Sequence, residues 1–347
     1  MSANSKPMRE RMEAFILELQ EEIITALENV DPNAPKFLRD RYERENNTGY
    51  GISGVFSVPV GEDGLAPAID TVLEKGGVNI SVVNGHLSQA AVQQMRAEHA
   101  SLPPPPEGGL PFFAAGLSLV IHPRNPHAPT SHANWRYFEV MEPGDSENPK
   151  TLAWWFGGGS DLTPFYLYEE DAVHFHKTMK DASDPFGTQV YPAFKKWCDE
   201  YFYITHRKET RGIGGLFWDD FTDAPHKSLS ESEKRPRSIE EIFAYVQALG
   251  RTFVPAYVPI LAKRCKQPST PRERRWQLIR RGRYAEFNLM IDRGTKFGLM
   301  APHARIESIL MSLPETARWE YMSDMGTDPE SPEGKLMAVV KVPREWV

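Results

Sequence analysis

The order of the predicted elements places this chain in the α+β class. Strand-like segments gather in its first half and helix-like segments follow, without the regular strand–helix alternation of a parallel α/β fold. Short connections between successive strands favour antiparallel pairing. No internal repeat and no long flexible linker divides the sequence, so we expect a single domain over residues 1–347.

Residues 1–30 are expected to form an amphipathic helix that packs on the body of the protein. Phe15, Leu19, Ile23 and Leu27 recur at helical spacing, with charged residues between them. This periodicity predicts one apolar stripe facing the core and one face in water.

The remaining elements follow from β-branched and aromatic runs for strands and from helical periodicity for helices. A strand hairpin is expected at 285–299, with Asp292, Arg293 and Gly294 near its turn. The other predicted strands are 77–85, 116–123, 132–140 and 151–159, and the other predicted helices are 169–183, 191–207, 238–265 and 270–284.

Charge and composition exclude several classes of protein. A net charge of −7 argues against general nucleic-acid binding, and an anionic ligand would need a local basic pocket. Cys198 and Cys265 lie far apart, which excludes a cysteine-only zinc site and suggests reducing surroundings. No apolar run approaches the roughly 20 residues that span a bilayer. The N-terminal segment is too charged for a signal peptide and too acidic for a typical mitochondrial transit peptide, so we expect a cytoplasmic location.

The stretch IHPRNPHAPTSHANWRYFEV, residues 121–140, carries the first candidate site. In a strand, alternate side chains point to opposite faces. If 116–123 pairs with 132–140, two imidazoles, an amide and a guanidinium share one face, which suits a recognised anion. A solvated polar face behind a proline-stiffened loop is the alternative. The residues of this face are Ser118, His122, His132, Asn134 and Arg136.

The second candidate is WWFGGGSDLTPFY, residues 154–166. Its three successive glycines would let the backbone approach a ligand closely, and Asp161 could accept N–H groups from that ligand. The pattern is neither a GxxxxGK[ST] phosphate loop nor a dinucleotide-binding GxGxxG. A bulged strand end with Asp161 capping a turn is the alternative.

Histidines and arginines supply two further candidate sets. A metal site from His122, His132, His176 and His206 is conceivable, but buried hydrogen-bonded histidines are the simpler reading, since no HExxH motif is present. Arginines at turns suit carboxylate binding, although surface pairs with Asp292 or Glu307 are the alternative. The basic residues concerned are Arg293, Lys296 and Arg305.

Taken in order, these stretches resemble the oxygen-dependent coproporphyrinogen III oxidase family. The resemblance runs from residue 40 to Val347, nearly the whole chain. It rests on long, compositionally unusual segments, which include GGVNISVVNGHLS, LVIHPRNPHAPTSHANWRYFEV, WWFGGGSDLTPFY, HRKETRGIGGLFWDD, RRGRYAEFNLMIDRGTKFGL and RIESILMSLPETARWEY.

The resemblance implies an oxidative decarboxylation in haem synthesis. Two propionates of coproporphyrinogen III, on rings A and B, become vinyl groups of protoporphyrinogen IX, with molecular oxygen as co-substrate and CO₂ and H₂O₂ as products. It implies that His132 is the proton donor and that Asp161 holds the pyrrole N–H groups, with Arg136 beside them. The implied substrate-binding positions are Ser118, Asn134, Trp135, Arg136, His303, Ala304 and Arg305.

The family's fold implies a large, flat antiparallel sheet with helices on both faces, and a homodimer formed through 78–87 and 284–320. Some members are proposed to bind a divalent metal through the four histidines above, but we expect no required metal or cofactor here. The HAR segment departs from the small-residue pair more usual before Arg305, so His303 could narrow the pocket or add a hydrogen-bond donor. The rival functions are a tetrapyrrole carrier without turnover and a histidine-metal oxygenase acting on another carboxylated aromatic compound.

Overall fold

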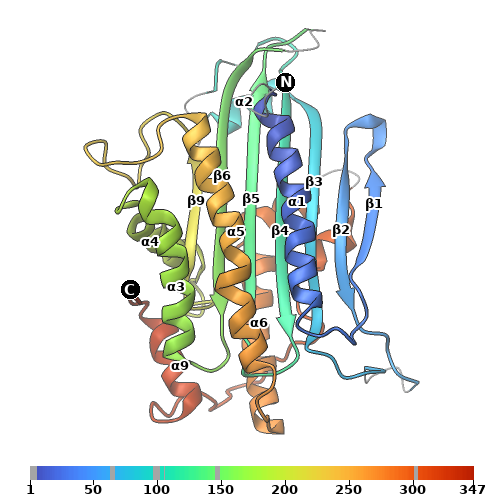
Figure 1. Cartoon of the computed structure of the whole chain (residues 1–347), viewed down its shortest axis with the longest axis vertical. Coiled ribbons are helices and arrows are strands. Elements are labelled where there is room, and N and C mark those ends of the chain that lie inside the picture. Colours follow the sequence, from blue (N-terminus) through green and yellow to red (C-terminus); the bar gives the residue numbers. More distant parts are fainter. Residues whose placement is uncertain (1–5, 63–66, 97–101, 105, 145–148, 301–303) are drawn as a thin grey trace.

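A seven-stranded antiparallel sheet, in the order β1-β2-β3-β4-β5-β6-β9, forms the centre of the molecule (Figure 1). The computed structural model describes residues 6–62, 67–96, 102–104, 106–144, 149–300 and 304–347. Strands β1 to β6 are neighbours in both sequence and space, which confirms the predicted α+β class with antiparallel pairing. The strands are β1 (Leu38–Glu43), β2 (Gly49–Ser57), β3 (Leu73–Leu87), β4 (Leu110–Pro123), β5 (Thr130–Met141), β6 (Thr151–Thr163) and β9 (Gly215–Phe221).

Alternation along the strands gives the sheet two different faces. Leu117 of β4 lies opposite Trp135 of β5, and both are fully buried at 0% exposure. One position along, Ser118 lies opposite Asn134, and both are partly exposed. We call the side of Leu117 and Trp135 the core face, and the side of Ser118 and Asn134 the open face.

Two long helices, α1 (Met8–Glu28) and α5 (Ile239–Arg264), cross the core face side by side (Figure 1). Helix α1 lies within the range of the predicted N-terminal amphipathic helix, of which residues 1–5 lie outside the described residues. Phe253 of α5 meets the Trp135 ring edge-on at 6.3 Å between centroids. Gly250 permits close helix packing, because a Cβ there would lie 2.7 Å from the Phe15 ring. Helices α3 (Glu169–Ser183) and α4 (Val190–Tyr201) pack against α5 and β9.

Helices and an extended segment also cross the open face, so the expectation of helices on both faces is confirmed (Figure 1). Ser308 contacts Ser53 of β2 and accepts a hydrogen bond from Asn79 of β3. Further along, the Ser312 carbonyl lies 2.9 Å from His122 Nε2 of β4. The elements outside the core face layer include α6 (Pro271–Met290), α7 (Arg293–Met300) and α8 (Ile306–Leu310), with α2 (Gln89–Met95) and α9 (Pro332–Lys341) elsewhere on the periphery.

The hairpin predicted at 285–299 is wrong, because this segment is helical. Helix α6 continues to Met290 and buries Phe287 and Asn288. The Asp292 carboxylate then accepts hydrogen bonds from the backbone N–H and the hydroxyl of Thr295, at 2.6 and 2.8 Å. Such a capping interaction begins a helix, which here is α7.

The helix predicted over 191–207 ends early, at Tyr201. The chain then forms a small hairpin of β7 (Tyr203–Ile204) and β8 (Glu209–Thr210). Lys208 has a φ of 55° in the turn of this hairpin, a left-handed conformation that helical periodicity does not anticipate. In the described part of the chain, no helix has the length and apolar character needed to cross a membrane.

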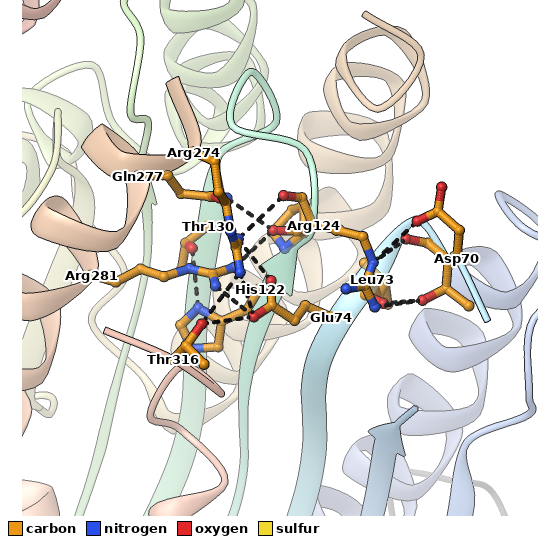
Figure 2. Close-up of polar contacts among 12 residues, drawn as sticks. Asp70, Leu73, Glu74, His122, Arg124, Thr130, Arg274, Gln277, Arg281 and Thr316 are labelled. Carbon is orange, nitrogen blue, oxygen red and sulfur yellow. Dashed lines mark hydrogen bonds and ion pairs between the residues drawn. The ribbon is translucent and has the colours of Figure 1, made fainter. Parts of the chain in front are cut away.

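A buried cluster of charges joins the start of β3 and the end of β4 to α6 (Figure 2). Glu74 lies 2.9 Å from Arg281, which is fully buried, and 2.9 Å from Arg274. Burial alone would raise the pKa of Glu74, but the two guanidinium charges outweigh it and lower the pKa to about 2. Arg281 also donates a hydrogen bond to the Pro123 carbonyl at the end of β4. The cluster therefore fixes α6 relative to the sheet.

We predict that Glu74→Gln lowers the free energy of unfolding by about 3–5 kcal/mol, because Arg281 stays buried without its counter-charge. In the wild type, the Glu74 contribution is present above its ordinary pKa of 4.5 and is lost as the pH falls towards 2. Urea unfolding at several pH values tests this, with the exposed Glu315→Gln as control. A loss no larger than that of the control would contradict the prediction.

Candidate active site

His132 and Asp161 form a cross-strand pair on the open face. They lie directly opposite each other on β5 and β6, so their side chains leave the sheet on the same side. His132 Nδ1 is 2.8 Å from Asp161 Oδ1. The imidazole keeps 21% of its surface exposed, whereas the carboxylate is only 2% exposed. The pair therefore presents its histidine outward and its aspartate inward.

Arg211 forms a buried ion pair with Asp161. Its Nη2 donates to Asp161 Oδ1 at 2.8 Å, and its Nε donates to Oδ2 at 3.2 Å. A third guanidinium nitrogen, Nη1, donates to Asn288 of α6 at 3.0 Å. The guanidinium also stacks on aromatic rings, with its carbon 4.0 Å from the Phe202 centroid and 4.7 Å from that of Tyr284. This ion pair is thus almost fully desolvated and geometrically fixed.

The charge on Asp161 determines how His132 is oriented. Burial would raise the pKa of Asp161, but the Arg211 charge and the hydrogen bond from His132 lower it below its ordinary value. An ionised carboxylate only accepts hydrogen bonds, so His132 must donate through Nδ1–H. In the neutral ring, Nε2 is then an acceptor that can take a proton.

Arg136 lies four residues after His132 on the same strand face, as the alternation predicted. Its Nη1 donates to Asn134 Oδ1 at 2.7 Å, and its Nη2 is 2.8 Å from Asp219 Oδ1 of β9. Gly116 and Gly157 are its register partners on the two neighbouring strands. Because neither glycine has a side chain, the Arg136 guanidinium can lie close to the backbone of the sheet.

The glycine run of β6 serves close packing within the protein. A Cβ at Gly157 would lie 2.6 Å from both Arg136 Cζ and Asp219 Oδ1. One at Gly158 would lie 2.5 Å from the Trp218 ring, and one at Gly159 would lie 2.6 Å from the Leu216 carbonyl. The expected close approach of backbone to a ligand is therefore replaced, in this structure, by close approach of side chains and of strand β9.

The other predicted ligand-binding residues are distributed across the sheet. Ser118 lies opposite Asn134 on the open face. The side chain of Trp135, however, points to the core face and has 0% exposure, so its predicted contact with substrate cannot involve the indole. Ala304 is partly exposed, and His303 lies outside the described residues.

Arg305 does not join Arg136. It forms an ion pair with Asp40 of the edge strand β1 and lies 4.7 Å from the Tyr42 ring centroid. Three strands separate β1 from β5, a distance of about 19 Å at the usual strand spacing. The two arginines therefore lie at opposite sides of the open face, and a contact of Arg305 with substrate stays a prediction.

The four candidate metal-binding histidines are not brought together. His122 bonds through both ring nitrogens, to Thr130 and to the Ser312 carbonyl, and His176 does so to Tyr191 and the Ile213 carbonyl. Burial lowers the pKa of both rings to about 3, so they are neutral structural histidines. His206 instead bonds to Glu286. Among the described residues, no group of three or more metal-ligating side chains converges.

Sequence reasoning missed Arg211, Asn288 and Asp219. Arg211 is the only charged residue between Thr210 and Trp218, and an isolated charge in a glycine-rich, apolar stretch signals a buried partner. Asn288 was hidden by the incorrect strand prediction. Asp219 belongs to a short acidic pair, which is usually a solvated turn, and gave no distinguishing signal.

These features define an acid–base site on an open sheet face, with a neighbouring guanidinium suited to an anionic ligand. A family model described as coproporphyrinogen III oxidase matches residues 11–346. The chain therefore belongs to the coproporphyrinogen III oxidase family.

Individual relatives are similar over nearly the whole chain. A human protein named oxygen-dependent coproporphyrinogen-III oxidase, mitochondrial, is 51% identical over 98% of this chain and 67% of its own length. The Drosophila melanogaster oxygen-dependent coproporphyrinogen-III oxidase is 52% identical over 98% of this chain and 78% of its own. A chloroplastic protein of the same name from Nicotiana tabacum is 43% identical, over 100% and 79%.

We predict that Arg211→Met inverts the contribution of Asp161 to stability at neutral pH. The wild-type carboxylate stabilises the fold above its unfolded pKa, about 3.9, and this contribution is lost only as the pH falls. In the variant, only His132 still opposes the effect of burial, so the Asp161 pKa rises and the ionised group destabilises the fold by about 3–5 kcal/mol near pH 7 and by less at pH 5.

Unfolding free energies measured from pH 5 to pH 8 test this prediction. Arg41→Met is the matched control, because Arg41 lies on the edge strand β1 with 54% of its side chain accessible and forms its ion pair with the exposed Glu43. If the two variants show the same dependence on pH, the proposed electrostatic role of Arg211 is wrong.

Proposed function

We propose that this protein catalyses the oxygen-dependent oxidative decarboxylation of coproporphyrinogen III to protoporphyrinogen IX. In each of two steps, a ring propionate loses CO₂ and a hydride equivalent to become a vinyl group. Molecular oxygen takes up the hydride and a proton and becomes H₂O₂. Membership of the family, with relatives named for this activity, supports the assignment.

The shape and chemistry of the open face carry the proposal. Ser53, Asn79, Ser118 and Asn134 lie opposite one another in register on β2 to β5 and form a polar row. A parallel row consists of Gly51, Ser81, Gly116, Arg136 and Gly157. Ser308 covers the β2 and β3 end of the polar row, whereas the positions of both rows on β4 and β5 stay partly exposed. A reduced tetrapyrrole carries four carboxylates and four N–H donors. Arg136 suits a propionate as a forked cation.

His132 is the group best placed to move protons in this scheme. With Nδ1–H held by Asp161, its Nε2 can accept a pyrrole proton, which makes the pyrrole electron-rich enough to react with oxygen. The resulting imidazolium is stabilised by the ionised Asp161 and can return its proton to the pyrrole nitrogen once CO₂ has left, while the proton that completes H₂O₂ comes from solvent. Because Asp161 is only 2% exposed and already bonds to Arg211 and His132, we assign it this orienting role rather than direct contact with the pyrroles.

The scheme uses the substrate, oxygen and side chains of this chain, and we propose that no resident metal or cofactor is required. We also propose a homodimer that uses the segments 78–87 and 284–320. The cytoplasmic location expected from the sequence stays a prediction. Two relatives have names that give a mitochondrial or a chloroplastic location. Cell fractionation distinguishes these locations from the cytoplasm.

We predict that the purified protein converts coproporphyrinogen III into protoporphyrinogen IX in air and in excess chelator, and that conversion stops when oxygen is removed. The products are separated by chromatography and identified by the number of carboxylates that each one retains. Dependence on a restored metal would contradict the metal-free proposal, and tight binding without any vinyl product would support a carrier instead.

In the same assay, His132→Gln is expected to lower kcat by about 10²–10⁴-fold through loss of the proton carrier. His174→Gln is the matched control, since that histidine lies on the exposed side of α3 and bonds to the Pro255 carbonyl. A folded His132→Gln protein with the turnover of the control would show that the proton passes elsewhere.

A further inference from the structure

The backbone of β9 is distorted where it passes Arg136. Phe156 of β6 pairs with Phe221 and Gly158 pairs with Trp218, so Asp219 and Asp220 together face the single residue Gly157. This two-against-one arrangement is a β-bulge. Asp220 has a φ of 51°, a left-handed conformation that costs energy outside glycine. Bulges re-aim side chains, and this one turns Asp219 towards Arg136.

Several contacts hold the bulge in this form. The Asp220 N–H donates to Asp219 Oδ1 at 3.1 Å. The Asp219 carbonyl lies 3.1 Å from Nε2 of His226, a buried histidine in the loop after β9. Gly157 leaves the space that the carboxylate and the guanidinium occupy. The local structure is therefore built around the position of the Asp219 carboxylate.

That carboxylate lies between two arginines from different elements. Asp219 Oδ1 is 2.8 Å from Nη2 of Arg136 on β5, and Oδ2 is 3.8 Å from Nη2 of Arg293 at the start of α7. The side chains of both arginines keep considerable exposure, 35% for Arg136 and 55% for Arg293. Their guanidinium groups are thus held near each other, while part of each stays accessible to a ligand.

Charge explains why a carboxylate is needed at this point. Two guanidinium groups this close repel each other unless an anion lies between them. Burial would raise the pKa of Asp219, but Arg136 lowers it, so the group is ionised. The three groups together carry a net charge of +1, which one further carboxylate neutralises.

We infer that Asp219 is a positioning residue that holds Arg136 and Arg293 together as a clamp for a single propionate of the substrate. This inference rests on the proposed function and adds to it a named clamp and the residue that assembles it. Asp219 acts through the arginines and does not itself contact the substrate. The intermediate formed after the first step still has three carboxylates. The clamp must bind one of them so that the intermediate stays on the enzyme until the second step.

The test compares Asp219→Ala with the wild type in the aerobic conversion of coproporphyrinogen III. We expect KM to rise about tenfold, the value of one charge-assisted contact, with kcat within about twofold. We also expect the tricarboxylate intermediate to accumulate in solution, because the loosened clamp releases it early. Asp219→Glu, which restores the charge, should recover part of the affinity.

The controls separate positioning from folding. Asp223→Ala removes the same charge from an exposed site in the following loop and should leave both constants unchanged. Urea unfolding checks that each variant is folded. If Asp219→Ala is unstable, Asp219→Asn replaces it, because asparagine keeps the size of the side chain and removes its charge; its KM should rise in the same way. An unchanged or lowered KM, with no intermediate accumulating, would overturn the inference. A wild type that makes no vinyl product would instead overturn the proposed function.

Discussion

The buried ion pair between Arg211 and Asp161 is the interaction on which the candidate site depends. Neither group could remain charged alone at this depth, because removing an unpaired charge from water costs several kcal/mol. Together they join β6 to the segment after β8, and Asn288 extends the connection to α6. The fixed negative charge then dictates which nitrogen of His132 bears the proton. One electrostatic requirement thus links the packing of three elements to the chemistry of one imidazole.

Strand register brings the remaining groups to the same face. Because alternate residues face opposite sides, Trp135 packs on α5 while Asn134 and Arg136 face outward. A slip of one residue would bury the polar row and expose the core. The long, continuous pairing of β3, β4, β5 and β6 prevents such a slip, and the charges around Glu74 and Arg281 fix the helix that supplies Asn288. Stability and function therefore depend on the same register.

The sequence predicts those features that depend on local periodicity. It correctly places His132, Asn134 and Arg136 on one strand face, and it predicts an amphipathic helix near the N-terminus, where α1 lies. Contacts between distant segments are a different matter: no local pattern pairs Arg211 with Asp161 or brings the bulge at Asp219 to Arg136. The apolar, aromatic run at 285–299 resembles a strand, yet the capping carboxylate of Asp292 and the packing of Phe287 make it helical. Arg305 is a residue type suited to binding a carboxylate ligand, but its ion pair with Asp40 holds it at the far edge of the sheet.

The central claim is that an ionised Asp161 fixes the proton of His132 on Nδ1. Nitrogen NMR of the protein labelled with ¹⁵N in its histidines, with His132→Gln to assign the resonance, tests this most directly. The account predicts a protonated Nδ1 at neutral pH in the wild type, and loss of that preference in Asp161→Ala. A wild-type His132 that carries its only proton on Nε2 would contradict the account.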